Sequence, residues 1–182
     1  NNMERKEKSI GIFSKTLITQ SINVSIINIG SNLKEMLEKL IAKKIEGKCI
    51  VEGYIKENSI RLISYSAGMI NGDYVKYEIV FECLVCNPVE GMHITCKVKN
   101  ITKAGIRAES VLEPSPVVIF ASRDHHLNSE SFNTVKIDDV IKVRVIGQRF
   151  ELNDVYISVI AEVIENKKEH GKVKKPKLVL HS

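Results

Sequence analysis

Residues 32–45, NLKEMLEKLIAKKI, predict a long helix in the N-terminal half of the chain. Apolar residues recur there at three- and four-residue steps, and lysines and glutamates occupy the positions between them, which is the pattern of an amphipathic helix. Asn32 with Glu35 three residues later has the form of a capping box, and Gly47 marks the end of the helix or the turn after it. The period of the pattern changes on both sides of this segment.

Strand-like segments flank the predicted helix. Residues 17–29 before it alternate β-branched and polar side chains, which indicates a strand that buries one face. Three further strands are predicted after the helix, at residues 49–56, 59–65 and 74–85. Gly68 and Gly72 bracket a loop at residues 67–73. Asn87 and Pro88 then interrupt the pattern, because proline cannot donate to a strand ladder, and we place a domain boundary there.

The C-terminal half predicts a small barrel. Five short apolar runs follow Gly91, separated by clusters of Gly, Pro, Asn and Asp. They lie at residues 92–101, 105–109, 117–120, 140–150 and 155–164. Five such strands in a short span favour the five-stranded oligonucleotide-binding (OB) barrel. The longest irregular stretch, residues 122–139, lies between the third and fourth strands, where such barrels commonly insert a helix or a loop.

The net charge of +5 is concentrated at the C-terminus. Of 27 basic and 22 acidic residues, six lysines and one glutamate lie in residues 166–182. Residues 1–165 therefore carry equal numbers of basic and acidic side chains, which excludes a wholly basic, nucleic-acid-coating domain. The composition of residues 166–182 predicts a mobile basic tail, which either adds salt-dependent affinity for a polyphosphate or only improves solubility.

The remaining composition favours an intracellular protein without a membrane segment. No apolar stretch approaches the roughly 18 residues needed to cross a bilayer, and no signal-peptide core follows the charged N-terminus. The four cysteines are therefore expected to be reduced thiols.

Signatures of catalysis are missing from the chain. There is no phosphate-binding glycine loop, no nucleophile elbow and no pair of histidines with a glutamate between them. Cys83 and Cys86, together with Cys49 and Cys96, could supply zinc ligands, but the last two stand alone, and we expect strand residues instead. Asp124, His125 and His126 are expected to form a solvated loop or a helix cap. We therefore predict no catalytic residue, no metal and no cofactor.

Basic residues of the barrel form the candidate RNA contact. The set comprises Lys97, Lys99, Lys103, Arg107, Arg123 and Arg149. Barrels of this kind bind single strands with stacking aromatic rings and a basic groove. The second predicted barrel strand carries Arg107 where a ring would be expected, although a guanidinium plane can itself stack on a base. A barrel used mainly for protein contact remains the alternative, because acidic residues are as frequent as basic ones in this region.

An ordered set of segments carries a family resemblance. It comprises residues 29–33 (IGSNL), 45–49 (IEGKC), 75–77 (VKY) before Pro88 and Gly91, 103–106 (KAGI), 120–123 (FASR), 143–149 (VRVIGQR) and 153–156 (NDVY). In this order the segments resemble those of the larger stalk subunit of multisubunit RNA polymerases. This family includes the seventh subunit of RNA polymerase II and its archaeal, polymerase I and polymerase III counterparts. The set covers roughly residues 24–165, although no single motif is specific.

The resemblance implies an α+β chain with two domains and a tail. Residues 1–87 would form a polymerase-docking tip domain, an antiparallel sheet around one helix, residues 88–165 the OB barrel, and residues 166–182 the tail. The family's docking loops map to residues 47–53 and 67–73. The implied docking residues are Gly47, Lys48, Gly53, Gly68, Asn71 and Gly72.

The resemblance also implies a function and partners. The chain would be a non-catalytic stalk subunit that docks on the large subunits of the polymerase near the clamp and contacts nascent RNA. A smaller stalk subunit is a further expected partner. The short insertion at residues 122–139 and the lysine tail resemble polymerases of large DNA viruses, so the protein is expected with its polymerase in the nucleus or in host cytoplasm and virion. The alternative is a free-standing OB-fold RNA-binding protein of translation or RNA decay.

Overall fold

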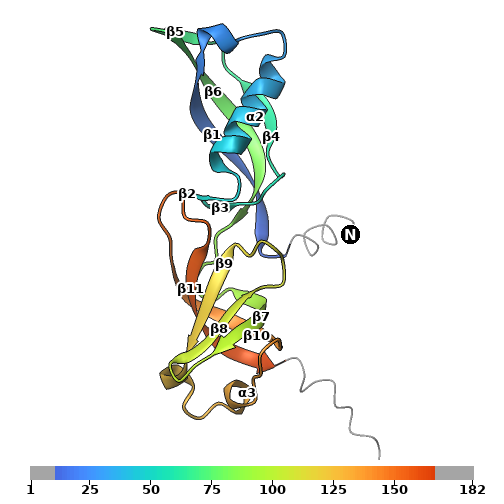
Figure 1. Cartoon of the computed structure of the whole chain (residues 1–182), viewed down its shortest axis with the longest axis vertical. Coiled ribbons are helices and arrows are strands. Elements are labelled where there is room, and N and C mark those ends of the chain that lie inside the picture. Colours follow the sequence, from blue (N-terminus) through green and yellow to red (C-terminus); the bar gives the residue numbers. More distant parts are fainter. Residues whose placement is uncertain (1–10, 167–182) are drawn as a thin grey trace, which may run out of the picture. The chain divides into compact units, whose positions relative to one another are not determined.

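The computed structural model describes residues 11–166, which are mostly β-strand with few helices (Figure 1). The chain forms an antiparallel sheet with one long helix and a closed five-stranded barrel, so the predicted α+β class is confirmed. Contacts divide the chain into two compact units. Among the described residues, the first unit comprises residues 11–88 together with Arg149–Ile157, and the second comprises Val89–Gln148 with residues 158–166.

The sheet of the first unit is built on two long strands. Strand β1 (Phe13–Ser25) pairs antiparallel with β6 (Tyr74–Cys86) along its whole length, without a register shift. Three short strands share the other edge of β6, and one of them pairs in turn with β2. These short strands are β2 (Cys49–Ile50), β3 (Gly53–Ile55), β4 (Arg61–Tyr65) and β5 (Met69–Asn71).

The helix of the first unit packs on one face of this sheet. Helix α2 (Leu33–Ile45) buries Leu37, Ile41 and Ile45 in a cluster with alternate residues of β6. Burying each of these side chains stabilises the fold by roughly 1.5–3 kcal/mol relative to leaving it exposed. The predicted capping box is wrong, because the Asn32 side chain makes no cap hydrogen bond. The Asn32 carbonyl accepts the Met36 N–H instead.

Three predictions for the first unit differ from the structure. The strand predicted at residues 17–29 is β1 at Phe13–Ser25, so it begins and ends earlier than predicted, and the short 3₁₀ helix η1 (Ile26–Asn28) replaces its predicted end. The strand predicted at residues 49–56 is split into β2 and β3 by a turn. The loop predicted at residues 67–73 contains β5, because its residues pair with the start of β6 to form a hairpin.

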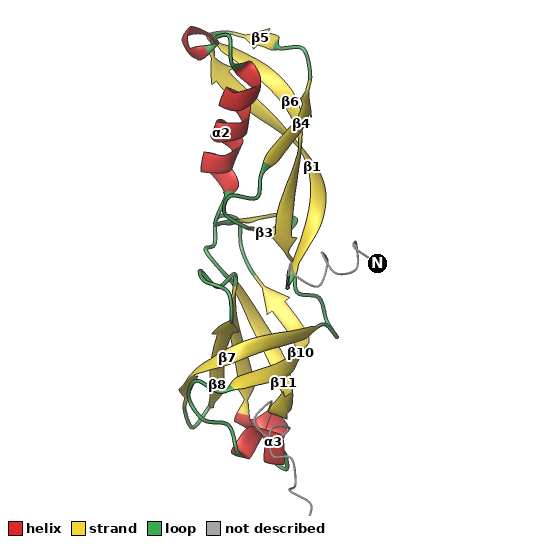
Figure 2. Cartoon of the chain, turned by 90° about the vertical axis from the view of Figure 1, so that its right-hand side faces the viewer, coloured by secondary structure: helices red, strands yellow, loops and turns green. Residues whose placement is uncertain are grey.

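The second unit is the predicted barrel. Its strands are β7 (His93–Ile101), β8 (Gly105–Ser110), β9 (Val117–Ser122), β10 (Val140–Arg149) and β11 (Ile157–Asn166). They close in the order β10-β11-β9-β8-β7, and alternate residues of each strand fill the interior. Figure 2 shows the short helix α3 (Glu130–Asn133) below the barrel strands. It follows η2 (Arg123–His126), so the predicted insertion is helical.

The predicted tail lies almost wholly outside the described residues. Only Asn166 is described, and it is buried at the end of β11, where its side-chain amide donates to Asp139. Among residues 11–166, no helix is long and apolar enough to cross a bilayer.

Candidate docking and RNA-contact surfaces

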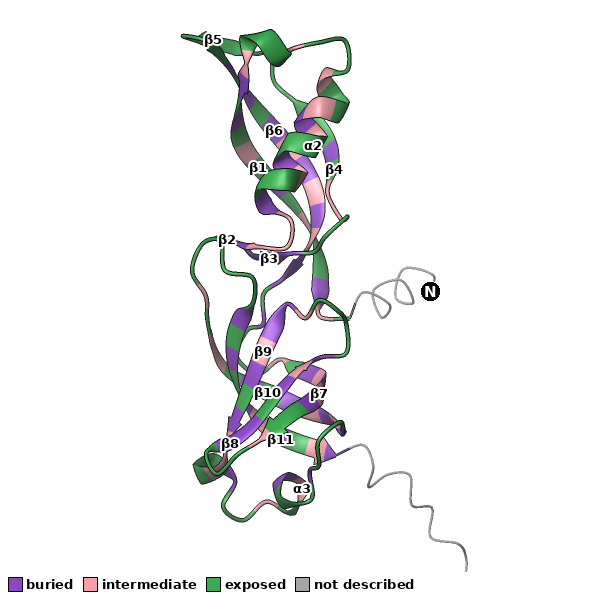
Figure 3. Cartoon of the chain, in the orientation of Figure 1, coloured by how far each residue is buried: buried purple, intermediate pink, exposed green. Residues whose placement is uncertain are grey.

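Figure 3 shows that the chain around the β5–β6 hairpin, at one end of the first unit, is mostly exposed. Several of the exposed residues there are apolar. The main-chain N–H of Ile26 donates to the carbonyl of Asp73 in the hairpin turn, at 3.0 Å, and so joins η1 to this end. We call the exposed apolar set Ile26, Ile27, Met69, Ile70 and Tyr74 the tip patch. Ile27 is 89% exposed and Ile70 75% exposed, which is unusual for isoleucine. The members of the tip patch are apolar, and two exposed charged residues border them: Asp73 in the hairpin turn and Lys76, the cross-strand partner of Met69.

Three of the predicted docking residues lie in this hairpin, but its apolar residues were not predicted. Gly72 is the first of two turn residues between Asn71 and Tyr74, and its φ is +60°, a value that glycine adopts without strain. Gly68 and Asn71 are also exposed here. The available signal was the pair Met69 and Ile70, two large apolar residues inside a short glycine-bracketed segment.

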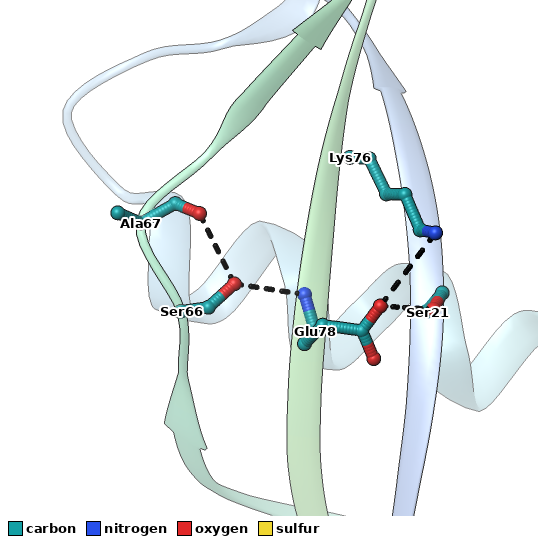
Figure 4. Close-up of polar contacts among 5 residues, drawn as sticks. All are labelled: Ser21, Ser66, Ala67, Lys76 and Glu78. Carbon is teal, nitrogen blue, oxygen red and sulfur yellow. Dashed lines mark hydrogen bonds and ion pairs between the residues drawn. The ribbon is translucent and has the colours of Figure 1, made fainter.

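A polar network joins the base of this hairpin to the two long strands (Figure 4). The Ser66 hydroxyl accepts the main-chain N–H of Glu78 at 3.0 Å and donates to the carbonyl of Ala67 at 3.1 Å. The Glu78 carboxylate accepts the Ser21 hydroxyl of β1 and lies 3.7 Å from the Lys76 ammonium. These groups connect β1, β6 and the segment before β5. They therefore fix the base of the hairpin relative to β1.

The other three predicted docking residues lie at the opposite end of β6. Gly47 follows α2 and donates its N–H to Ile55, and Lys48 is half-buried beside it. Gly53 is buried with a φ of +134°, and a Cβ there would lie 2.3 Å from the Cys86 carbonyl oxygen. Tyr74 and Cys86, which pair with β5 and β3, are twelve residues apart on β6. That spacing is roughly 40 Å of strand. The structure therefore does not bring the two predicted docking loops together.

The barrel brings three predicted RNA-contact residues to one outer face. Lys97, Lys99 and Arg107 lie on β7 and β8, on positions that alternate with interior residues. The register shifts between Val98 and Asn100, so Lys99 sits in a bulge. Two of these cations have acidic neighbours: Lys97 lies 3.7 Å from Asp138, and Arg107 lies 3.6 Å from Glu109.

An aromatic ring that was not predicted as a site residue lies beside Arg107. Phe120 of β9 is the direct cross-strand partner of Arg107 and is 39% exposed on the outer face. Asn100 of β7 pairs with Arg107 from the other side, so the three residues form one row across β7, β8 and β9. The expected ring is thus present, one strand further along the sheet than predicted. The sequence could have indicated Phe120 as a site residue, because the predicted third strand, residues 117–120, ends with this phenylalanine.

The remaining predicted RNA-contact residues lie on other elements than β7 and β8. Arg123 donates through Nε to the carbonyl of Lys103 and through a terminal nitrogen to the carbonyl of Thr102, at 3.1 and 2.9 Å. Its guanidinium also lies 5.2 Å from the centre of the Phe132 ring. Arg123 therefore fixes the β7–β8 loop, on which Lys103 is exposed. Arg149 is exposed on the segment Arg149–Ile157, which belongs with the first unit.

The prediction of a solvated histidine pair is wrong for His126. This side chain is 4% exposed and stacks on the Phe132 ring at 4.4 Å between ring centres. Its Nδ1 lies 2.6 Å from the Ser122 carbonyl oxygen, and its Nε2 accepts the main-chain N–H of Val163 at 2.9 Å. His126 therefore joins η2 to β9 and β11, whereas its neighbour His125 is exposed.

The four cysteines are buried strand residues with unreactive thiols. Burial raises the pKa of Cys49 and Cys83 to about 11 and that of Cys86 and Cys96 to about 12. Cys83 and Cys86 are three residues apart on one strand, so their side chains point to opposite faces. Among residues 11–166, no group of three or more His, Cys, Asp or Glu side chains could hold a metal ion.

Comparison with known proteins identifies an informative relative. The chain is 24% identical over 171 residues to a curated protein of Acanthamoeba polyphaga mimivirus that is provisionally named a DNA-directed RNA polymerase subunit. The match covers 85% of this chain and 83% of the relative. No protein-family model matches the chain. The similarity supports an RNA polymerase subunit but does not distinguish which subunit.

Proposed function

We propose that this chain is a non-catalytic stalk subunit of a DNA-directed RNA polymerase. The observation that carries the proposal is the similarity to a viral polymerase subunit along most of both chains. The fold adds support, because a helix-covered sheet followed by a barrel of OB-like strand order is the arrangement that the stalk resemblance implies. The chain would stay with its polymerase, in the nucleus or, for a virus, in host cytoplasm and virion.

The tip patch is the proposed surface for the large polymerase subunits. Its five side chains are apolar or aromatic, and docking would remove them from water. Large side chains in the centre of a contact usually carry most of its binding free energy. The network of Ser66, Glu78 and Ser21 holds the hairpin in place before binding, which reduces the ordering cost of association. The second predicted loop, at Gly47 and Lys48, would meet a different part of the polymerase or a smaller stalk subunit.

Co-purification tests this assignment. A tagged chain expressed with its polymerase should recover the two large subunits after nuclease treatment. The double variant Met69→Ser with Ile70→Ser should lose them, because it removes two exposed apolar side chains without touching the core. Ile160→Ser on β11 is the matched control, since Ile160 is also exposed but lies on the barrel. Equal recovery by the tip variant and the control would contradict docking through the tip patch.

The row of Asn100, Arg107 and Phe120 favours single-stranded RNA as a ligand of the barrel. An exposed ring can stack on a base of any identity, a guanidinium can stack or bind phosphate, and Lys97, Lys99 and Lys103 add positive charge. Within the stalk assignment, this ligand would be the nascent transcript. A free-standing RNA-binding protein of translation or RNA decay would use the same row.

The two roles differ in whether the wild-type chain recovers the large polymerase subunits. If the chain is a stalk subunit, Phe120→Ala should weaken RNA binding and leave recovery of the large polymerase subunits unchanged. Binding of RNA by the wild-type chain, with no large subunit recovered under any condition, would instead favour the free-standing protein.

A further inference from the structure

Strand β1 is the one long open edge among the strands of residues 11–166. It is the first strand in the sheet order, and β6 is its one neighbour. It has 13 residues, whereas the strands on the other edge of β6 have three or five, and β2 beyond β3 has two. The strands of the second unit close into a barrel and leave no such edge. Figure 2 shows β1 along the side of the first unit.

This edge lacks the features that usually prevent strand addition. Natural edge strands are kept short, carry several charges or a proline, or bend at a bulge. Strand β1 carries one charged residue, Lys15, and no proline. Its pairing with β6 runs from Phe13 to Ser25 without a register shift. Main-chain groups of alternate residues therefore face outward along a regular, nearly uncharged strand.

We propose that β1 pairs antiparallel with β1 of a second copy of this chain, centred on Leu17. Leu17 lies on the sheet face opposite α2, since its neighbour Ile18 is in the core, and it is 64% exposed. In a symmetric pair centred on this residue, the two Leu17 side chains face one another directly. Apolar cross-strand pairs of this kind stabilise sheets.

The charge pattern of β1 permits this register, because its one charged residue, Lys15, does not lie at the centre. A symmetric antiparallel pair about Leu17 sets Lys15 of one copy opposite Thr19 of the other, so no like charges meet. Phe13 falls opposite Ser21, and Thr16 falls opposite Ile18. The two copies then form one continuous sheet, and the interface is the same surface on both copies. This inference goes beyond the proposed function and does not depend on it.

Disulfide trapping tests the pair and its register. All four native cysteines are buried, so Leu17→Cys introduces an exposed thiol on β1. Directly opposite strand residues have Cα atoms about 4.5–5.5 Å apart, which suits a disulfide. The full chain carrying Leu17→Cys should therefore form a covalent dimer under mild oxidation. Asn23→Cys is the matched control, because Asn23 is exposed on the same face but far from the symmetry axis.

The two cysteine variants should cross-link at different rates. Rapid cross-linking of Leu17→Cys with little cross-linking of Asn23→Cys supports the proposed register. Equal rates for the two variants would indicate random collision and overturn it, as would the absence of cross-linking in both.

Sedimentation of the untrapped protein provides a second, independent test. The wild-type chain should show a concentration-dependent dimer, and Leu17→Lys should raise its dissociation constant about tenfold, because two ammonium groups replace the leucine pair. Ser64→Lys on β4 adds the same charge at an exposed position away from β1 and should leave the constant unchanged. Circular dichroism checks that each variant is folded. A wild-type chain that stays monomeric at all concentrations, or equal effects of the two lysine variants, would overturn the proposal.

Discussion

The two units of this chain differ in whether their sheet has a free edge. The second unit closes five strands into a barrel, so its main-chain groups are paired internally and its outer surface consists of side chains. The first unit keeps an open sheet, with α2 on one face and β1 free along one edge. A barrel therefore offers partners the faces of its strands, whereas an open sheet also offers its edge and the tips of its hairpins.

This difference assigns different chemistry to the two units. The outer face of the barrel carries Arg107, Phe120 and nearby lysines, which suit a nucleic acid. The exposed end of the first unit carries apolar side chains, which suit another protein. The neutral charge balance of residues 1–165 agrees with this division, because a basic surface need not extend over both units.

The largest expected effect comes from replacing a glycine at which two neighbouring strands approach each other closely. Each unit has one such glycine. A Cβ at Gly53 would lie 2.3 Å from the Cys86 carbonyl oxygen, and one at Gly105 would lie 2.1 Å from that of Ala121. Both residues have positive φ, so each alanine variant should lose about 3 kcal/mol or more of stability. Hydrogen exchange should report the loss in the first unit for Gly53→Ala and in the barrel for Gly105→Ala.

Gly30→Ala is the control for both variants. A Cβ at Gly30 would meet no other atom within 4 Å, and the φ of this residue is not positive, so its replacement should change stability by less than about 0.5 kcal/mol. If Gly53→Ala and Gly105→Ala both increased exchange throughout the chain, the expected local effect would be wrong.

His126→Ala should give the next largest effect. The variant leaves the Val163 N–H without its acceptor and removes the ring that stacks on Phe132, which should cost about 2–3 kcal/mol. Denaturant unfolding measures the loss. His125→Ala is the matched control and should be nearly neutral, because His125 is exposed. Equal stabilities of the two variants would show that His126 does not hold the insertion against β11.

Phe120→Ala should weaken RNA binding without loss of stability. Stacking of a base on an aromatic ring contributes about 1–3 kcal/mol, so the affinity for a short single-stranded RNA should fall roughly five- to 150-fold. Fluorescence anisotropy with a labelled oligonucleotide measures the change. Ile146→Ala removes an exposed apolar side chain from β10, which pairs with neither β8 nor β9, and should bind as the wild type does. An unchanged RNA affinity of the Phe120→Ala variant would contradict RNA contact by this row of the barrel.

At neutral pH the cysteines should give the smallest effect, because the raised pKa of their thiols changes stability only in alkali. Folding raises their pKa to about 11 or 12, so the folded chain keeps protons that the unfolded chain releases near pH 9. Stability should therefore be unaffected below about pH 8 and should decrease as the pH rises through 9 to 11. At pH 8, a thiol reagent should label the four cysteines only after unfolding. Rapid labelling of the native chain would contradict their burial.

The barrel was the more predictable of the two units. Its five apolar runs matched five strands within a few residues, because alternation of buried and exposed side chains is a local property. The β5 strand in the first unit was missed for the opposite reason. Residues 69–71 are exposed and show no buried alternation, and they become a strand only because β6 begins two residues later and pairs with them.

The same contrast between local pattern and long-range contact applies to the site residues. Lys97, Lys99 and Arg107 could be grouped from the sequence, because they occupy outward positions of consecutive strands. The structural roles of Arg123 and His126 could not be predicted, since the groups they bind lie 20 and 37 residues away in the chain. Phe120 became a candidate only when the register set it beside Arg107.

The sequence by itself determined the α+β class, the amphipathic helix, the strand periodicity and the neutral charge balance of residues 1–165. Each of these depends on neighbouring residues or on composition. Tertiary structure alone decided that β1 has a free edge, that the two predicted docking loops lie at opposite ends of β6, and that a ring lies next to Arg107. The reason is physical: strand order and register are set by hydrogen bonds between residues far apart in the chain, which no local pattern records.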